Sequence, residues 1–124
     1  MTQLIKSIHH VSLIVANTET ALGFYRDLLG LEVLDNRPDL GYPGAWLKIG
    51  ELQIHLLELP NPDQVAGRPM HGGRDRHLAL SLVDLDGLVE RLNAVGLSFT
   101  LSRSGRRALF CRDPDGNALE FVEI

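Results

Sequence analysis

Three histidines and one glutamate, His10, His55, His77 and Glu120, have side chains that commonly bind metal ions. His10 and His77 each open an alternating apolar segment, and the other two lie within apolar segments. Three imidazoles and one carboxylate form a competent N/O ligand set for Zn²⁺, Ni²⁺, Fe²⁺ or Mn²⁺. Because a lone strand histidine is more often structural or solvated, the hypothesis requires these four positions to be related.

An internal repeat relates them. The segment "HVSLIVANTETALGFYRDLLGL" from His10 resembles "HLALSLVDLDGLVERLNAVGL" from His77. The segments "AWLKIGELQIHLLE" and "ALFCRDPDGNALEFVE" also match, which aligns His55 with Glu120. Two copies are too few for a solenoid, so we expect one domain of two paired modules, in which a pseudo-twofold axis could bring the four groups together.

Each copy predicts the same order of elements. An alternating apolar segment indicates a strand, an apolar stripe at helical spacing follows it, and short strands close the copy. The pattern predicts an α+β fold of two tandem βαβββ modules, at about 5–59 and 76–124. The segment of about 60–75, rich in Pro, Gly and charge, is a linker. The expected N-cap is Asn17 or Thr18 for the first helix and Asp84 or Asp86 for the second. Gly30 and Gly96 are expected to end the two helices.

Strand alternation separates the two adjacent histidines. His9 and His10 must point to opposite faces, and His9 lies at the edge of the apolar face that a helix should cover. His10 shares its face with Ser12, as His77 does with small residues, which suits a lined cavity. We expect His9 to be a strand-edge residue or an outer partner of a ligand, and His71, in "PMHGGRDR", to be exposed.

Composition excludes several classes of function. The chain has 124 residues, 44% of them hydrophobic, and a formal net charge of −4, which argues against non-specific nucleic-acid binding and anionic membranes. No apolar run is long enough for a membrane span, and "MTQLIKS" does not resemble a signal peptide. A single cysteine, Cys111, fits a reducing cytoplasm, and its apolar surroundings predict a core residue.

The segments "IHHVSLIV", "FYRDLLGL", "RHLALSL" and "DPDGNALEFVE" resemble the vicinal oxygen chelate superfamily over essentially the whole chain. That superfamily includes glyoxalase I, extradiol dioxygenases, fosfomycin-resistance proteins and bleomycin-binding proteins. The resemblance implies half-barrel sheets around one divalent metal per site and a homodimer with shared sites. It implies that the ligands are His10, His55, His77 and Glu120.

Three functions follow from the resemblance. The first is a metal-dependent lyase or isomerase of glyoxalase type, which stabilises an enediolate of a small substrate chelated through two adjacent oxygens, with Glu120 or His55 moving the proton. The second is an Fe²⁺ extradiol dioxygenase, which needs only His10, His77 and Glu120. The third is binding of a small molecule such as an antibiotic. Glyoxalase-like members usually carry Glu or Gln where this chain has His55, and an intact ligand set argues against pure binding.

The substrate is less constrained by the sequence. Arg103, Arg106 and Arg107 lie together in "SRSGRR" and could capture a carboxylate or phosphate, or could form a solvated loop. Trp46 and Tyr42 could line a pocket or pack in the core.

Overall fold

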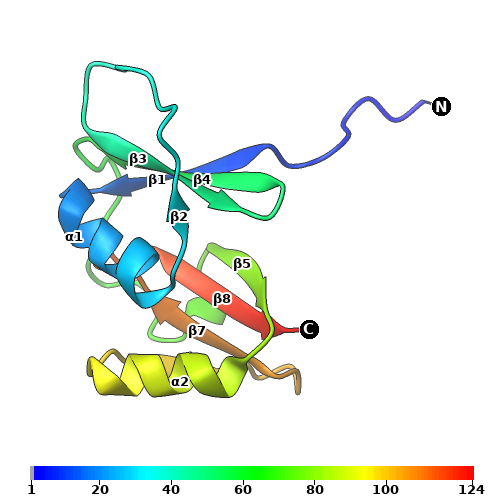
Figure 1. Cartoon of the computed structure of the whole chain (residues 1–124). Helices are drawn as coiled ribbons and strands as arrows, with labels where there is room; N and C mark the ends of the chain where they lie inside the picture. Colours follow the sequence, from blue (N-terminus) through cyan, green and yellow to red (C-terminus); the bar gives the residue numbers. More distant parts are fainter. Residues whose placement is uncertain (1) are drawn as a thin grey trace. The chain divides into compact units, whose positions relative to one another are not determined.

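The computed structural model describes residues 2–124, which form two compact units, the residues up to 61 (unit one) and 62–124 (unit two). Each unit contains a four-stranded sheet and a helical segment (Figure 1). The predicted α+β fold of two βαβββ modules is confirmed. Unit one comprises β1 (His10–Val15), α1 (Thr18–Leu22), the π-helical η1 (Gly23–Leu28), β2 (Glu32–Val33), β3 (Gly44–Ile49) and β4 (Leu52–Glu58). Unit two comprises the 3₁₀ turn η2 (Gly72–Arg74), β5 (His77–Leu82), α2 (Leu85–Ala94), β6 (Phe99–Leu101), β7 (Ala108–Arg112) and β8 (Ala118–Glu123).

The two sheets have the same topology and register. Their strand orders are β1-β4-β3-β2 and β5-β8-β7-β6, with the first and last strands of each module parallel and the other pairs antiparallel. Ser12 of β1 lies opposite His55 of β4, and Ala79 of β5 lies opposite Glu120 of β8. The repeat alignment of His55 with Glu120 therefore holds in the strand register.

Both helices begin at caps that the sequence predicts. The side chains of Asn17 and Asp84 each accept a hydrogen bond from the backbone N–H three residues further on. A carboxylate from the last strand of each module, Glu58 or Glu123, accepts a second N–H at the start of the helix. Repeat-related residues therefore anchor the helix of each unit to its sheet.

The helix ends and the core follow the predicted pattern, with one exception. Gly30 and Gly96 follow the helices with φ of +79° and +69°, a conformation that favours glycine. Val95, the apolar residue before Gly96, is 61% exposed, because it caps α2 where the chain turns away. No helix among residues 2–124 has the length and apolar character needed to cross a membrane. The largest fully buried side chains are Tyr25, Leu47, Ile54, Leu56, Leu92, Leu109, Leu119 and Val15.

An ion-pair network holds the segment before β5 against unit two. The Asp75 carboxylate accepts hydrogen bonds at 2.8 Å from the guanidinium groups of Arg68 and Arg112. Arg112 also donates to the carbonyl oxygens of Pro69 and Gly116. The hydrogen bonds from Arg68 are the largest influence that lowers the pKa of Asp75 well below its usual value.

Replacing Asp75 by asparagine is expected to lower the free energy of unfolding at pH 7 by about 2 kcal/mol, because two part-buried arginines lose their carboxylate. A carboxyl group with a lowered folded pKa stabilises the protein above its unfolded pKa of 3.8, and this contribution is lost as the pH falls through the folded pKa. The stability difference between wild type and variant should therefore shrink below about pH 4. Urea unfolding of both proteins at pH 7 and pH 3 measures this stability difference.

The matched control is Asp63→Asn, which removes an ion pair with Arg76 whose side chains are 51% and 66% exposed. This variant is expected to lower the free energy of unfolding at pH 7 by only about 0–1 kcal/mol. Equal losses in the two variants would contradict a special role for Asp75.

Candidate metal centre

In unit one, two aromatic rings stack on His55. The His10 and His55 rings are stacked with centroids 4.1 Å apart, and the Trp46 indole stacks on His55 at 4.4 Å. His55 is 8% exposed, whereas His10 is exposed. Trp46, which the sequence left open as a pocket wall or a core residue, thus covers one candidate ligand.

The contacts of His55 leave one ring nitrogen able to bind a metal. Its Nε2 lies 2.7 Å from Oε1 of Gln53, an acceptor, so Nε2 carries the proton and Nδ1 keeps its lone pair. Burial, followed by the positive charges that His10, His9 and Arg37 can carry, lowers the pKa of His55. Neutral imidazole at pH 7 is the form that coordinates metals.

His9 contacts His10 directly. The Nδ1 atoms of the two rings lie 2.8 Å apart, and when His10 donates in this contact its Nε2 keeps a lone pair for a ligand. β1 begins at His10, so His9 precedes the strand, and its ring meets the His10 ring edge-on. This position suits an outer partner that orients the His10 ring.

In unit two, a histidine ring faces a buried carboxylate. Nδ1 of His77 lies 2.9 Å from the carbonyl oxygen of Asp75 and donates to it, so the Nε2 lone pair is directed elsewhere. Nε2 lies 3.2 Å from Oε1 of Glu120, a residue that is 3% exposed. The Glu120 carboxylate thus has His77 at one oxygen and the Arg106 guanidinium, 2.8 Å away, at the other.

The four candidate ligands thus form two pairs, one in each unit. Across residues 2–124, no three His, Cys, Asp or Glu side chains come together as a metal-binding group. Each pair nevertheless has the right chemistry, because imidazole nitrogens and a carboxylate oxygen suit Zn²⁺, Ni²⁺, Fe²⁺ and Mn²⁺. The facing acceptors His77 and Glu120 also fit a bound divalent cation.

The expectation that His71 is exposed is wrong. His71 is 9% exposed, its Nδ1 lies 2.7 Å from Oγ1 of Thr100, and its ring meets Phe110 edge-on at 4.8 Å. Burial is the main influence that lowers its pKa. No local pattern identifies this position, because both partners come from strands far along the chain.

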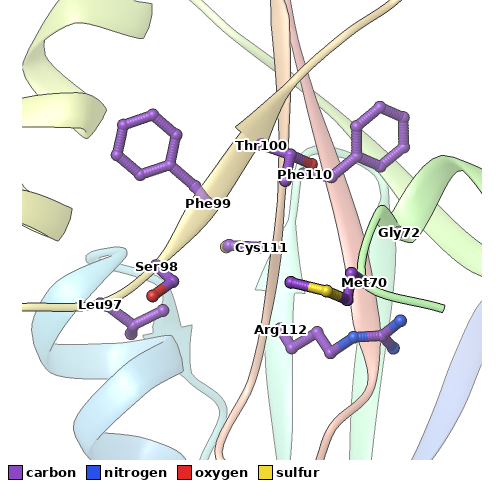
Figure 2. A pocket seen from close by; sticks show the side chains of 9 residues that line it. All are labelled: Met70, Gly72, Leu97, Ser98, Phe99, Thr100, Phe110, Cys111 and Arg112. Atoms are coloured by element: carbon purple, nitrogen blue, oxygen red, sulfur yellow. The ribbon is translucent and has the colours of Figure 1, made fainter. Parts of the chain in front are cut away.

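A cavity of about 370 Å³ opens beside this histidine. Figure 2 shows its walls, which come from residues 97–100 around the start of β6, from β7 and from the segment before β5, with Ser98, Thr100 and Arg112 among mainly apolar side chains. The Phe110 ring lines the cavity and also contacts the His77 ring edge-on at 5.1 Å. The cavity and the second candidate pair therefore share a wall, which the sequence did not reveal.

The predicted core role of Cys111 is confirmed. The side chain is 4% exposed and lies in β7, with one edge on the cavity. Burial raises the pKa of the thiol to about 12, so it is protonated at neutral pH and a poor nucleophile.

The comparisons with known proteins agree with this architecture. The profile of the glyoxalase/bleomycin resistance protein/dioxygenase superfamily matches residues 7–121. The chain belongs to this superfamily. The resemblance to the vicinal oxygen chelate superfamily is thereby confirmed.

Individual members of the superfamily are similar over almost the whole chain. YwkD of Bacillus subtilis is 34% identical, with 97% of this chain and 98% of YwkD aligned. Glyoxylase I 4 of Arabidopsis thaliana is 26% identical over 92% of this chain and 68% of its own length. The crystal structure of a glyoxalase family protein from Bacillus anthracis has a TM-score of 0.82 at 25% identity, covering 99% of this chain and 98% of that one.

Proposed function

We propose that the chain is a metal-dependent lyase or isomerase of glyoxalase type, acting on a small substrate through two adjacent oxygens. The proposed ligands of one divalent ion are His10, His55, His77 and Glu120. The observation that supports this most is the contact between Nε2 of His77 and the buried Glu120 carboxylate, which brings two candidate ligands together. The neutral, stacked His55 in the equivalent strand of unit one adds a second donor of the right form.

A bound divalent cation supplies Lewis acidity toward the two substrate oxygens, which makes the adjacent carbon more acidic. Glu120 and His55 are the groups of this chain that can accept a proton from that carbon and return it. Trp46 covers one face of the His55 ring and keeps water from it. Gln53 holds the proton on Nε2, which leaves one lone pair, on Nδ1. Where that lone pair binds the ion, Glu120 is the group that moves the proton.

Named relatives support an enzymatic role. Lactoylglutathione lyase of Haemophilus influenzae is 29% identical over 94% of this chain and 91% of its own length. A manganese-dependent 2,3-dihydroxybiphenyl 1,2-dioxygenase from Geobacillus is also 29% identical, but the chain spans only 37% of it. The dioxygenase is therefore the second candidate, with His10, His77 and Glu120 as its triad and His55 as acid or base.

The third candidate is binding without catalysis. The fold of TnmS3, an antibiotic binding protein from Streptomyces, matches this chain with a TM-score of 0.74 at 21% identity. A pure binder has no need of the four donors, so this function is the least favoured. We also propose a homodimer, as the resemblance implies, in which modules of the two chains pair to complete each site.

The experiment that separates the candidates uses protein stripped with a chelator and reloaded singly with Zn²⁺, Ni²⁺, Fe²⁺ or Mn²⁺. Each form is incubated in D₂O with a panel of α-hydroxycarbonyl compounds, and exchange of the carbon-bound proton is followed by NMR. Each form is also given catechol in an oxygen electrode. We expect metal-dependent proton exchange, at least about 100-fold above the stripped protein. Oxygen uptake without proton exchange would instead support the dioxygenase.

A further inference from the structure

The neighbouring arginines Arg106 and Arg107 serve different faces of unit two. The Arg107 guanidinium lies 2.6 Å from Glu123 and 3.1 Å from Asp86, so it ties the start of β7 to the last strand and the start of α2. Nη2 of Arg106 instead lies 2.8 Å from Oε2 of Glu120, the oxygen that does not face His77. Only Arg106 of this pair reaches the candidate metal centre.

The environment of Arg106 suits a side chain that changes partners. Its side chain is 57% exposed, whereas that of Glu120 is 4% exposed, so the guanidinium reaches from solvent onto a buried carboxylate. Its other side-chain contact is from Nε to the Ser104 hydroxyl at 3.2 Å. These contacts use two of the five N–H groups of the guanidinium, and the remaining groups keep the planar arrangement that matches carboxylate or phosphate.

A divalent ion bound by Glu120 would compete with Arg106 for the negative charge of the carboxylate. Arginine cannot lose its proton in proteins, so its positive charge would then lie close to that of the metal. The repulsion is relieved when an anionic group lies between the guanidinium and the ion.

We propose that Arg106 binds an anionic group of the substrate, a carboxylate or a phosphate, beside the metal centre. This inference rests on the proposed function, and it names the class of substrate. In the absence of the ion, Arg106 forms an ion pair with Glu120. Once Glu120 binds the ion, Arg106 binds the substrate anion instead. Specificity for an anionic substrate then arises from a residue outside the ligand set.

The test uses the full-length protein loaded with Mn²⁺ and titrated by calorimetry with oxalate in one arm and inorganic phosphate in the other. We expect Arg106→Gln to weaken binding of at least one anion about tenfold, because a charge-assisted, paired hydrogen bond is lost. Arg106→Lys keeps the charge but not the planar donors, so its anion affinity should lie between those of the wild type and Arg106→Gln. Arg103→Gln, which removes the same charge from the same loop, is the matched control and should bind both anions as the wild type does.

The affinity for Mn²⁺ alone gives a second readout that a merely structural role would not predict. Arg106→Gln should bind Mn²⁺ about threefold more tightly than the wild type, because a competing cation has been removed. Unchanged binding of both anions, or loss of Mn²⁺ by Arg106→Gln, would overturn the inference and leave the proposed function standing. A wild type that binds no Mn²⁺ would overturn both. Because Arg106 is exposed, circular dichroism should show normal folding of the variants.

Discussion

His10→Ala and His77→Ala are each expected to strip the bound metal and abolish activity while the chain stays folded. Each change removes one nitrogen of the proposed four-donor set, and the two residues occupy repeat-related strand positions. Neither side chain belongs to the core, since His10 is exposed and the His77 side chain is 26% exposed. Elemental analysis of the purified variants measures metal content, and circular dichroism confirms folding.

His9→Ala is the matched control for His10→Ala. Its ring contacts Nδ1 of His10, so its loss should weaken metal affinity by no more than about tenfold to 100-fold, as outer partners of a ligand do. Metal content at saturating metal should remain near that of the wild type. If His9→Ala strips the metal and His10→Ala does not, then the ligand is His9, and the proposed metal-binding face of β1 is wrong.

His55→Ala distinguishes the two enzyme candidates. In a four-donor site, the variant should lose metal affinity by well over 100-fold, which exceeds the effect of an outer partner. In a dioxygenase triad, the variant should keep its Fe²⁺ and lose only turnover. We expect the first result, because the buried, neutral His55 keeps a lone pair at Nδ1.

Two further variants make this result specific to coordination. His55→Gln keeps an oxygen donor at the position and should retain part of the metal affinity. Gln53→Ala removes only the hydrogen-bond partner of His55 and should lower affinity about 10–100-fold. If Gln53→Ala and His55→Ala lose metal equally, then His55 acts on the site indirectly. Urea unfolding corrects for the packing that His55→Ala removes beneath Trp46.

The fold was predictable because the sequence contains two copies of the same strand and helix pattern. Alternation indicated the strands, Asn17 and Asp84 marked the helix starts, and the repeat alignment predicted the matching registers of His55 and Glu120. Each of these signals is local or depends on comparing one half of the chain with the other. Neither kind requires knowledge of which distant segments meet.

Features that depend on distant contacts were missed. His71 lies in a segment that is rich in glycine and charge and suggests exposure, yet Thr100 and Phe110 bury it. The segment owes its order to the Asp75 carboxylate, whose arginine partners lie on both sides of it in the sequence. Sequence patterns describe the segment itself, whereas burial here is decided by β6 and β7.

The sequence proposes the residues of the candidate site, but it does not specify their contacts. The stacking of Trp46 on His55 depends on the pairing register of β3 and β4, which alternation within either strand does not specify. The contact of Arg106 with Glu120 did leave a signal, because Arg106 alternates in phase with Phe110, which pairs with Glu120 across the sheet. If the alternation of β7 is extended into the preceding loop, Arg106 falls on the face of Glu120 and Arg107 on the opposite face.

The most direct test of the metal centre is a titration of the chelator-stripped wild type with Mn²⁺, in which electron paramagnetic resonance measures the free ion. Glu120→Gln, which keeps the shape of the side chain and removes its charge, is titrated in parallel. We predict saturation of the wild type at about one ion per chain, as four donors forming one site require, and at least about 100-fold weaker binding by the variant. Absence of saturable binding by the wild type, or equal binding by the variant, would contradict the proposed metal centre.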